Sequence, residues 1–327
     1  MSTLTNVESN RKSNNIGTQL ENVDTSITKD RSILFHLKTL YLFTKSDFKT
    51  VIVPQAVFAL AMMFSGSKLG VSVTNQLTTA YISTRLLSMF AWLWIQLLVV
   101  DISNQRFPES VAEDAINKPW RPLPSKRISM EEAQHMLRIL VPAVVVISVA
   151  MGNFTPCSVI MVLAWLYNDL GAGNASLLQR NVINAVALSC FGWGALIVLF
   201  HFEGTAATLL RNWTILTATV MLTTVHVQDF PDIPGDRARG RKTIPLVYGE
   251  GWTRAGLAIL IPLWSIACLA FWNIKSPVVW IPTLLVGNTM SLITMVRQEH
   301  SYDKIVWKLW CLWMTQLYLL PIFSART

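Results

Sequence analysis

Charged residues are scarce in this chain of 327 residues: Asp, Glu, Lys and Arg make up 14% of it, while hydrophobic residues make up 52%. Soluble globular domains carry roughly 25% charged residues. The composition therefore argues against an ordinary soluble protein and indicates an integral membrane protein. The 13 Trp residues agree with this, because Trp gathers at membrane–water interfaces.

Cysteine patterns with a chemical function are also missing. The four Cys residues stand singly in apolar runs, with no CxxC pair and no Cys/His pair at zinc-ligand spacing. We expect buried thiols. The net charge is +8, but no Lys/Arg-rich stripe with interleaved aromatic residues is present, which excludes nucleic acid as the predicted partner.

The N-terminal segment has no apolar core of the kind that a secretory signal requires. It is rich in Ser, Thr, Asn and charge, a composition typical of disorder. We therefore predict a disordered cytosolic tail over residues 1–35 and a single helical domain over residues 36–327.

Long apolar runs dominate the rest of the chain, and a bilayer-spanning helix needs about twenty mostly apolar residues. Nine runs are candidates: 48–64, 84–103, 136–152, 156–172, 184–201, 212–229, 254–272, 278–296 and 305–323. The predicted fold class is all-α, a polytopic membrane protein surrounded by lipid, with about nine transmembrane helices around a central cavity.

Lys and Arg are concentrated before the first run and after the second, sixth and eighth runs. Cytosolic loops carry this excess of positive charge. The distribution predicts a cytosolic N-terminus and cytosolic loops after the second and sixth runs, and we expect the membrane to be the endoplasmic reticulum.

The loop after the second run is polar and contains Asn104, Gln105, Glu109, Glu113 and Asp114. Amide and carboxylate oxygens are the ligands that Mg²⁺ prefers. Gln105, Glu109 and Glu113 recur every four residues, which favours one helical face unless Pro108 kinks the helix. The alternative is a polar helix cap, and the sequence leaves open whether Glu113 or Asp114 faces a cation.

The loop after the sixth run carries Asp229, Asp232 and Asp236 at three- and four-residue spacing. Three carboxylates at a membrane boundary are unfavourable unless a cation neutralises them. Prolines and a glycine between them break the helix, as in membrane sites where irregular backbone lines a cavity. The alternative is a solvated helix end, but the pattern favours a metal site.

Basic residues follow each acidic loop. Lys118 and Arg121 follow the first loop, and Arg237 and Lys242 follow the second. Such residues commonly determine membrane topology. Beside clustered carboxylates they are also suited to bind a phosphate group. Carboxylates, amides and cations together predict a Mg²⁺-bound diphosphate at the bilayer surface.

These residues resemble the two signature motifs of the UbiA superfamily of intramembrane prenyltransferases. The matching segments are Asn104-Gln followed by Lys118-Pro-Trp-Arg-Pro-Leu-Pro, and Gln228-Asp-x-x-Asp-x-x-x-Asp-Arg-x-x-Gly-Arg-Lys-Thr. The resemblance covers residue 36 onward and implies nine helices and two Asp-rich loops that hold Mg²⁺ and an isoprenyl diphosphate. It carries the metal-binding role to Asp229, Asp232 and Asp236.

The first motif departs from the usual one, because Gln105 replaces an Asp and Pro108 and Ala112 stand where acids occur in most members. It resembles the divergent fungal branch that includes UbiA-type terpene cyclases. The resemblance implies that farnesyl or geranylgeranyl diphosphate is ionised and cyclised in secondary-metabolite terpenoid biosynthesis. Five residues are the expected catalytic set: Asn104, Gln105, Glu109, Asp232 and Asp236.

Two alternatives remain. A prenyltransferase would pass the prenyl group to an aromatic acceptor, which Tyr167 and Asn168 could orient in the pocket. A transporter could use the same intramembrane charges, although the acids lie at helix ends and not at the midplane. No obligate protein partner is inferred.

Overall fold

The computed structural model describes residues 31–66, 78–200 and 206–325, and within these ranges every regular element is a helix. The chain divides into two compact units, residues 1–41 and 42–327. The smaller unit contributes the start of helix α2 (Ile33–Thr44). The predicted disordered tail, residues 1–35, lies outside the described residues except for its last five, and the predicted domain boundary stays a prediction.

The larger unit is a bundle of long apolar helices, and each of the nine predicted runs falls on a helical segment of the described chain. The segments are η1 with α3 (Phe48–Ile52 and Val53–Ser65), α4 (Thr79–Gln105), α6 (Met130–Ala150), α7 (Phe154–Asn168), α9 (Leu177–Leu199), α10 (Ala206–Thr224), α13 (Glu250–Phe271), α14 (Pro277–Val296) and α15 (His300–Leu319). Seven of them are long and apolar enough to cross a membrane. Helix α7 has only 15 residues, and α10 is not among the seven. The all-helical, multi-pass fold is confirmed, but the count of nine spans is not.

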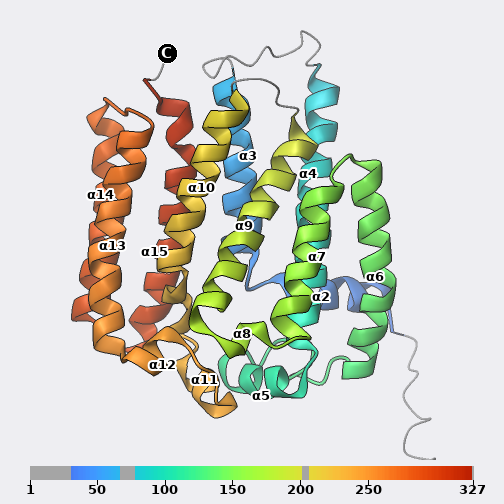
Figure 1. Ribbon diagram of the computed structural model, residues 1–327. Helices are drawn as coiled ribbons and strands as arrows, with labels where there is room; N and C mark the ends of the chain where they lie inside the picture. Colours follow the sequence, from blue (N-terminus) through green and yellow to red (C-terminus); the bar gives the residue numbers. More distant parts are fainter. Residues whose placement is uncertain (1–30, 67–77, 201–205, 326–327) are drawn as a thin grey trace, which may run out of the picture. The chain divides into compact units, whose positions relative to one another are not determined.

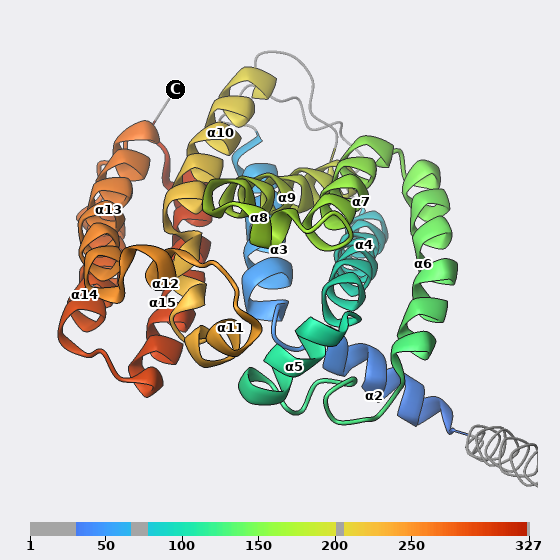
Figure 2. The same ribbon diagram turned by 60° about the horizontal axis from the view of Figure 1, so that its bottom comes forward.

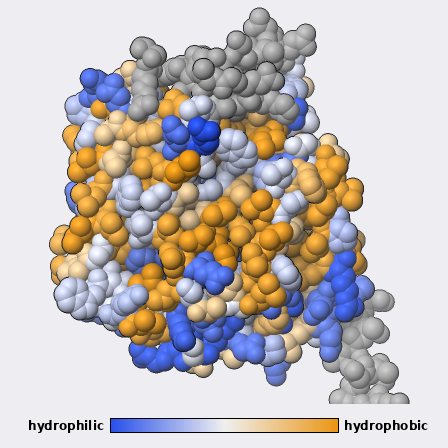
Figure 3. Space-filling view, viewed as in Figure 1, coloured by the Kyte–Doolittle hydropathy of each residue, from blue (hydrophilic) through white to orange (hydrophobic). Residues whose placement is uncertain are grey.

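Short helices connect the long ones. They are α5 (Pro108–Asn117), α8 (Ala172–Ala175), η3 (Val225–Asp229), α11 (Ile233–Arg239), α12 (Ile244–Tyr248) and η4 (Leu320–Phe323). Helices α5, α8, α11 and α12 gather at one end of the bundle, hereafter the polar end (Figures 1 and 2). In the space-filling view, apolar side chains cover much of the middle of the visible face, and hydrophilic ones gather at this end (Figure 3).

The sequence explains how the chain returns from the polar end into the bundle at α6. The Ser129 hydroxyl accepts a hydrogen bond from the Glu132 amide (3.1 Å), and the Glu132 carboxylate accepts one from the Ser129 amide (2.7 Å). This reciprocal capping box satisfies two amides that the first helical turn leaves without partners. The helix start is therefore fixed by local chemistry.

Close packing around α9 sets the spacing of the helices that surround the site. A Cβ atom at Gly194 would lie 2.1 Å from the Trp92 ring, and one at Gly192 would lie 2.5 Å from the Gln55 side chain. These glycines let α4 and α3 approach α9 closely, as small residues do between membrane helices. Trp92 is fully buried and its indole donates to the Ser148 hydroxyl (3.0 Å).

Candidate active site

A cavity of about 680 Å³ opens at the polar end and extends between α4, α7 and α9. Its inner lining is apolar and includes Val100, Leu163, Ile183, Leu188 and Phe191. On α9 the lining runs from Arg180 to Phe191, which is roughly 16 Å along a helix that rises 1.5 Å per residue. The volume lies in the range of small-molecule sites, roughly 300–1,000 Å³. The cavity thus joins a charged mouth to an apolar chamber.

The first acidic loop does not form one helical face. Helix α4 ends at Gln105, and α5 begins at Pro108, whose ring occupies the first helical turn. Asn104 lines the cavity and donates to the Asn168 side chain (3.1 Å). Gln105 is buried and donates to the Phe43 carbonyl (3.0 Å). Gln105, predicted as a catalytic residue, and the exposed Glu109, predicted as a catalytic and metal-binding residue, therefore do not line the cavity.

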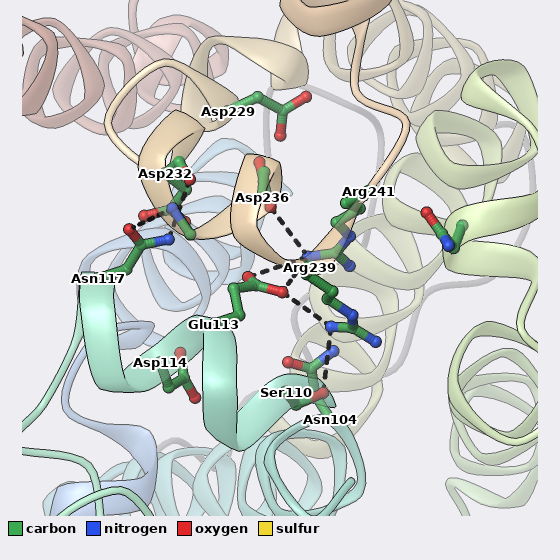
Figure 4. A network of polar contacts seen from close by, with 12 residues as sticks. Asn104, Ser110, Glu113, Asp114, Asn117, Asp229, Asp232, Asp236, Arg239 and Arg241 are labelled. Atoms are coloured by element: carbon green, nitrogen blue, oxygen red, sulfur yellow. Dashed lines mark hydrogen bonds and ion pairs between the residues drawn. The ribbon is translucent and has the colours of Figure 1, made fainter. Parts of the chain in front are cut away.

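The second acidic loop is a chain of short turns. Asp229 ends the 3-10 helix η3, Asp232 precedes α11, and Asp236 lies within α11. Gly240 ends α11 with a φ of 70°, a left-handed conformation that favours glycine. The three carboxylates therefore point in different directions and do not share one helical face (Figure 4).

Asn117, at the end of α5, holds the two acidic loops together. Its side-chain NH₂ donates to the Asp232 carbonyl (3.0 Å), and its side-chain oxygen accepts from the Gly235 amide (3.1 Å). A Cβ atom at Gly235 would lie 2.3 Å from the Asn117 side chain and 2.8 Å from the Glu113 carbonyl. Helices α5 and α11 therefore pack backbone to backbone here (Figure 4). No sequence pattern predicted this contact.

Basic side chains neutralise two of the three carboxylates of the second acidic loop. Asp229 accepts two hydrogen bonds from Arg180 (2.7 and 2.6 Å), and Asp232 accepts one from Lys118 (2.8 Å). Both pairs join residues that are distant in the sequence. Burial alone would raise the pKa of Asp232, but Lys118, Arg121 and Arg180 together outweigh this effect and the pKa is lowered.

The first loop is neutralised in the same way. Both Asp114 oxygens accept from Arg121 at 2.8 Å. Glu113 accepts from Arg239 at 2.8 Å and from Arg241 at 3.2 Å. Glu113 lines the cavity, whereas Asp114 does not and is paired with Arg121.

Asp236 differs from Glu113, Asp114, Asp229 and Asp232, which all accept hydrogen bonds from basic side chains. It is 1% exposed, and neither carboxylate oxygen has a hydrogen-bond partner. The Arg241 guanidinium lies 3.6 Å away, too far for a hydrogen bond but close enough for charge attraction. Burial and the nearby Glu113 carboxylate raise the pKa of Asp236 to about 7. A buried carboxylate without donors is costly unless a proton or a cation compensates it.

The donor set fits a hard divalent cation that a ligand helps to hold. Within residues 31–66, 78–200 and 206–325, no group of three or more His, Cys, Asp or Glu side chains could hold a metal ion by itself. Mg²⁺, however, is usually bound by one or two carboxylates together with waters and substrate phosphates. Asp232 and Asn104 line the cavity and offer such oxygens. Asp229 and Asp236 are not among the lining residues, but the buried Asp236 carboxylate has no hydrogen-bond partner and leaves both oxygens available to a cation.

Cations line the mouth, but only some are those predicted from the sequence. Lys118 and Arg121 line the cavity, whereas Arg237 and Lys242 are exposed and do not. Two cations that the sequence analysis missed, Arg180 and Arg241, line it instead. A lone Arg at the start of the apolar run 177–199 is a recognisable signal, since charges in membrane segments are rare and functional.

The two predicted pocket residues both line the cavity. The Tyr167 hydroxyl accepts hydrogen bonds from Arg241 (2.8 Å) and Arg180 (3.2 Å), and Asn168 is hydrogen-bonded to Asn104. Phe191, deeper in the chamber, adds an aromatic face. Aromatic rings therefore lie both at the mouth and inside.

Comparison with known proteins places these observations in a family. A family model described as UbiA prenyltransferase family matches residues 78–315. The fumagillin beta-trans-bergamotene synthase af520 of Aspergillus fumigatus is 30% identical over 290 residues, which are 88% of this chain and 92% of that protein. The diterpene cyclase eriG of Hericium erinaceus is 28% identical over 224 residues, which are 67% of this chain and 66% of that protein.

A solved structure shares the fold. A UbiA homolog from Archaeoglobus fulgidus, bound to GPP and Mg²⁺, superposes with a TM-score of 0.57 at 12% identity. The match covers 86% of this chain and 99% of that one. At this identity the likeness concerns the arrangement of helices and not the ligands.

Proposed function

The chain belongs to the UbiA prenyltransferase family, and from this membership we propose that it is a Mg²⁺-dependent membrane terpene cyclase. It ionises an isoprenyl diphosphate, farnesyl or geranylgeranyl diphosphate, and cyclises the resulting carbocation in terpenoid biosynthesis. The observation that carries the proposal is the cavity of about 680 Å³, which joins a mouth of carboxylates and cations to an apolar chamber.

The mouth suits the diphosphate. Lys118, Arg121, Arg180 and Arg241 line it and offer donors to phosphate oxygens. Asp232 and Asp236, with Asn104 from the first loop, would hold Mg²⁺. The ion, when bound, supplies positive charge that stabilises the charge developing on the leaving diphosphate.

The chamber suits the hydrocarbon. The allylic C–O bond breaks and its electron pair leaves with the diphosphate, which creates a carbocation in the chamber. Val100, Leu163, Ile183 and Leu188 exclude water that would trap the cation. The ring of Phe191 offers a π-face that stabilises positive charge. Double bonds of the same chain then attack the cation, and loss of a proton ends the reaction.

The relatives favour cyclisation over prenyl transfer. The protein that matches over 92% of its own length is named a synthase, and a second relative is named a diterpene cyclase. A prenyltransferase would need an acceptor beside the cation, and Tyr167 and Asn168 are the polar side chains placed to orient one. We therefore keep transfer to an aromatic acceptor as the second function.

The chain is a multi-pass membrane protein. We further propose that it resides in the endoplasmic reticulum with the polar end on the cytosolic side. The excess of Lys and Arg in the loops of this end supports that orientation.

The test is turnover by the purified protein in lipid nanodiscs with Mg²⁺ and one prenyl diphosphate. We expect a cyclic hydrocarbon and released diphosphate. Asp232→Ala should lower the turnover rate about 10²- to 10³-fold, the typical effect of removing one electrostatic contact to a transition state. Glu131→Ala, which removes an exposed carboxylate at the start of α6, is the matched control.

The outcome also separates the two functions. If no hydrocarbon forms without an acceptor, while an added phenol becomes prenylated, the protein is a prenyltransferase. If neither product forms but EDTA-sensitive binding of the diphosphate remains, cyclisation and transfer are both wrong.

A further inference from the structure

Four lysines line the cavity mouth on the side formed by α15, by η1 and by the turn that precedes η1. These residues, which we call the lysine wall, are Lys45, Lys49, Lys304 and Lys308. In the sequence, Lys45 and Lys49 lie more than 250 positions before Lys304 and Lys308, and the two pairs belong to separate segments. Lys304 and Lys308 are four residues apart on α15 and share one face of that helix. The fold brings all four to one cavity.

The lysine wall lacks the counter-charges that the acidic loops possess. Lys118, Arg121, Arg180 and Arg241 each form an ion pair with a carboxylate. In the described part of the chain, none of the four ammonium groups of the lysine wall forms one. Like charges gathered at a low-dielectric boundary repel each other and attract an anion.

Two indole rings position this charge without neutralising it. The Lys45 ammonium lies 4.6 Å from the centre of the Trp120 ring, and the Lys49 ammonium lies 5.8 Å from that of Trp307. A cation over an indole face is stabilised by the ring quadrupole and keeps its charge. Trp307 lies on α15 between Lys304 and Lys308. Aromatic rings therefore position Lys45 and Lys49, whereas Lys304 and Lys308 are exposed on α15.

The outer surface of α15 continues this wall with apolar side chains. Ile305 is 43% exposed and Leu312 is 47% exposed. Ile305, Lys308 and Leu312 recur at three- and four-residue spacing, so the charge and the apolar side chains share one helical face. Cationic side chains beside exposed apolar side chains at the end of a membrane helix match a phosphate headgroup joined to a hydrocarbon tail.

We propose that the lysine wall is a phosphate-binding site for an anionic amphiphile, separate from the acidic loops and independent of a metal ion. The phosphate group lies against Lys304 and Lys308, and the hydrocarbon lies along α15 beside Ile305 and Leu312. Two sources share this chemistry: an anionic phospholipid of the bilayer and a prenyl diphosphate on its way into the cavity. The site goes beyond the proposed function, because it needs neither ionisation nor cyclisation.

The experiment compares wild type, K304Q/K308Q and the charge-matched control K126Q/K275Q in nanodiscs with EDTA present. Lys126 and Lys275 are exposed and do not line the cavity. In one arm, phosphatidylcholine nanodiscs are titrated with inorganic diphosphate. In the other, phosphatidylcholine is compared with phosphatidylcholine containing phosphatidic acid, and bound lipid is counted by native mass spectrometry. Circular dichroism checks that each variant is folded.

We expect the wild type and the control to bind in at least one arm and K304Q/K308Q to bind about tenfold more weakly in that arm. Binding in the first arm assigns the site to a diphosphate, and retention of phosphatidic acid in the second assigns it to a phospholipid. Equal binding by all three proteins, or no binding by the wild type in either arm, would overturn the proposal. Loss of the proposed function would instead appear as absent Mg²⁺-dependent turnover.

Discussion

The carboxylate of Asp236 is buried without a hydrogen-bond donor, and its pKa is raised to about 7. In an unfolded chain the pKa of an Asp side chain is about 3.9. Between these two pH values the folded protein holds a proton that the unfolded chain has lost. The stability that this group contributes is complete below pH ~4 and is lost as the pH rises through about 7.

A pH-dependent response to Mg²⁺ follows from this shift. We expect the melting temperature of the metal-free protein to fall between pH 5 and pH 8. The decrease should be about 2–4 °C for each kcal/mol by which the free energy of unfolding falls. Mg²⁺ needs the ionised carboxylate, so it should raise the melting temperature more at pH 8 than at pH 6. Differential scanning fluorimetry in detergent, with and without Mg²⁺, measures both effects.

The matched variant is Asp236→Asn, which keeps the shape of the side chain and cannot ionise. It should be less sensitive to pH and less stabilised by Mg²⁺ than the wild type. A variant with an unchanged pH profile would show that another group controls the transition.

At the scale of elements, the contact between α5 and α11 decides whether the acidic loops meet. Gly235→Ala should separate them, because the added methyl group would meet the Asn117 side chain at 2.3 Å and the Glu113 backbone at 2.8 Å. Overpacking of this kind typically costs about 1–3 kcal/mol. We expect a lower melting temperature and at least a tenfold loss of turnover with a prenyl diphosphate.

Gly256→Ala is the control for this prediction, since a Cβ atom there meets nothing within 4 Å and the residue lies inside helix α13. It should leave activity unchanged. If Gly235→Ala is as active as Gly256→Ala, the backbone contact between the loops is not needed for function.

The elements also show where sequence patterns are sufficient. Long apolar runs located the membrane helices, because hydrophobic length is a property of the chain itself. The four-residue rhythm of Gln105, Glu109 and Glu113 predicted one helical face, but the helix breaks at Pro108 and the three side chains diverge. The proline was visible in the sequence, whereas the direction of the chain after it depends on contacts with α11.

At the scale of the whole molecule, the loop charges predict which end faces the cytosol. Ala115→Cys places a thiol on exposed α5 at the polar end, and Lys275→Cys places one on the exposed turn between α13 and α14, at the opposite end (Figure 1). In sealed microsomes we expect an impermeant maleimide to label Ala115→Cys directly, and Lys275→Cys only after permeabilisation.

The four native cysteines are buried or half-buried, which keeps their background labelling low. A cysteine-free protein carrying neither substitution gives the baseline. The reverse labelling pattern would place the acidic loops in the lumen and reject the predicted orientation.

The assembly of the mouth is the part that sequence patterns could not provide. Arg180 meets Asp229 across 49 positions, and Arg241 meets Glu113 across 128. Neither pairing follows from local spacing, because the first depends on how η3 packs against α9 and the second on how α11 packs against α5. The acids could be selected from the sequence as a group, but their basic partners could not.

These internal partners have a consequence for ligand order. Asp229, Asp232, Asp114 and Glu113 already hold Arg or Lys side chains, so the acidic loops are close to electroneutral before any ligand arrives. A metal ion alone would leave the displaced Arg and Lys side chains without counter-charges. A phosphate alone would leave the displaced carboxylates without theirs. When both arrive together, each occupies the charges that the other sets free. The metal ion and the phosphate must therefore strengthen each other's binding. The pocket reaches its full affinity only when both are bound.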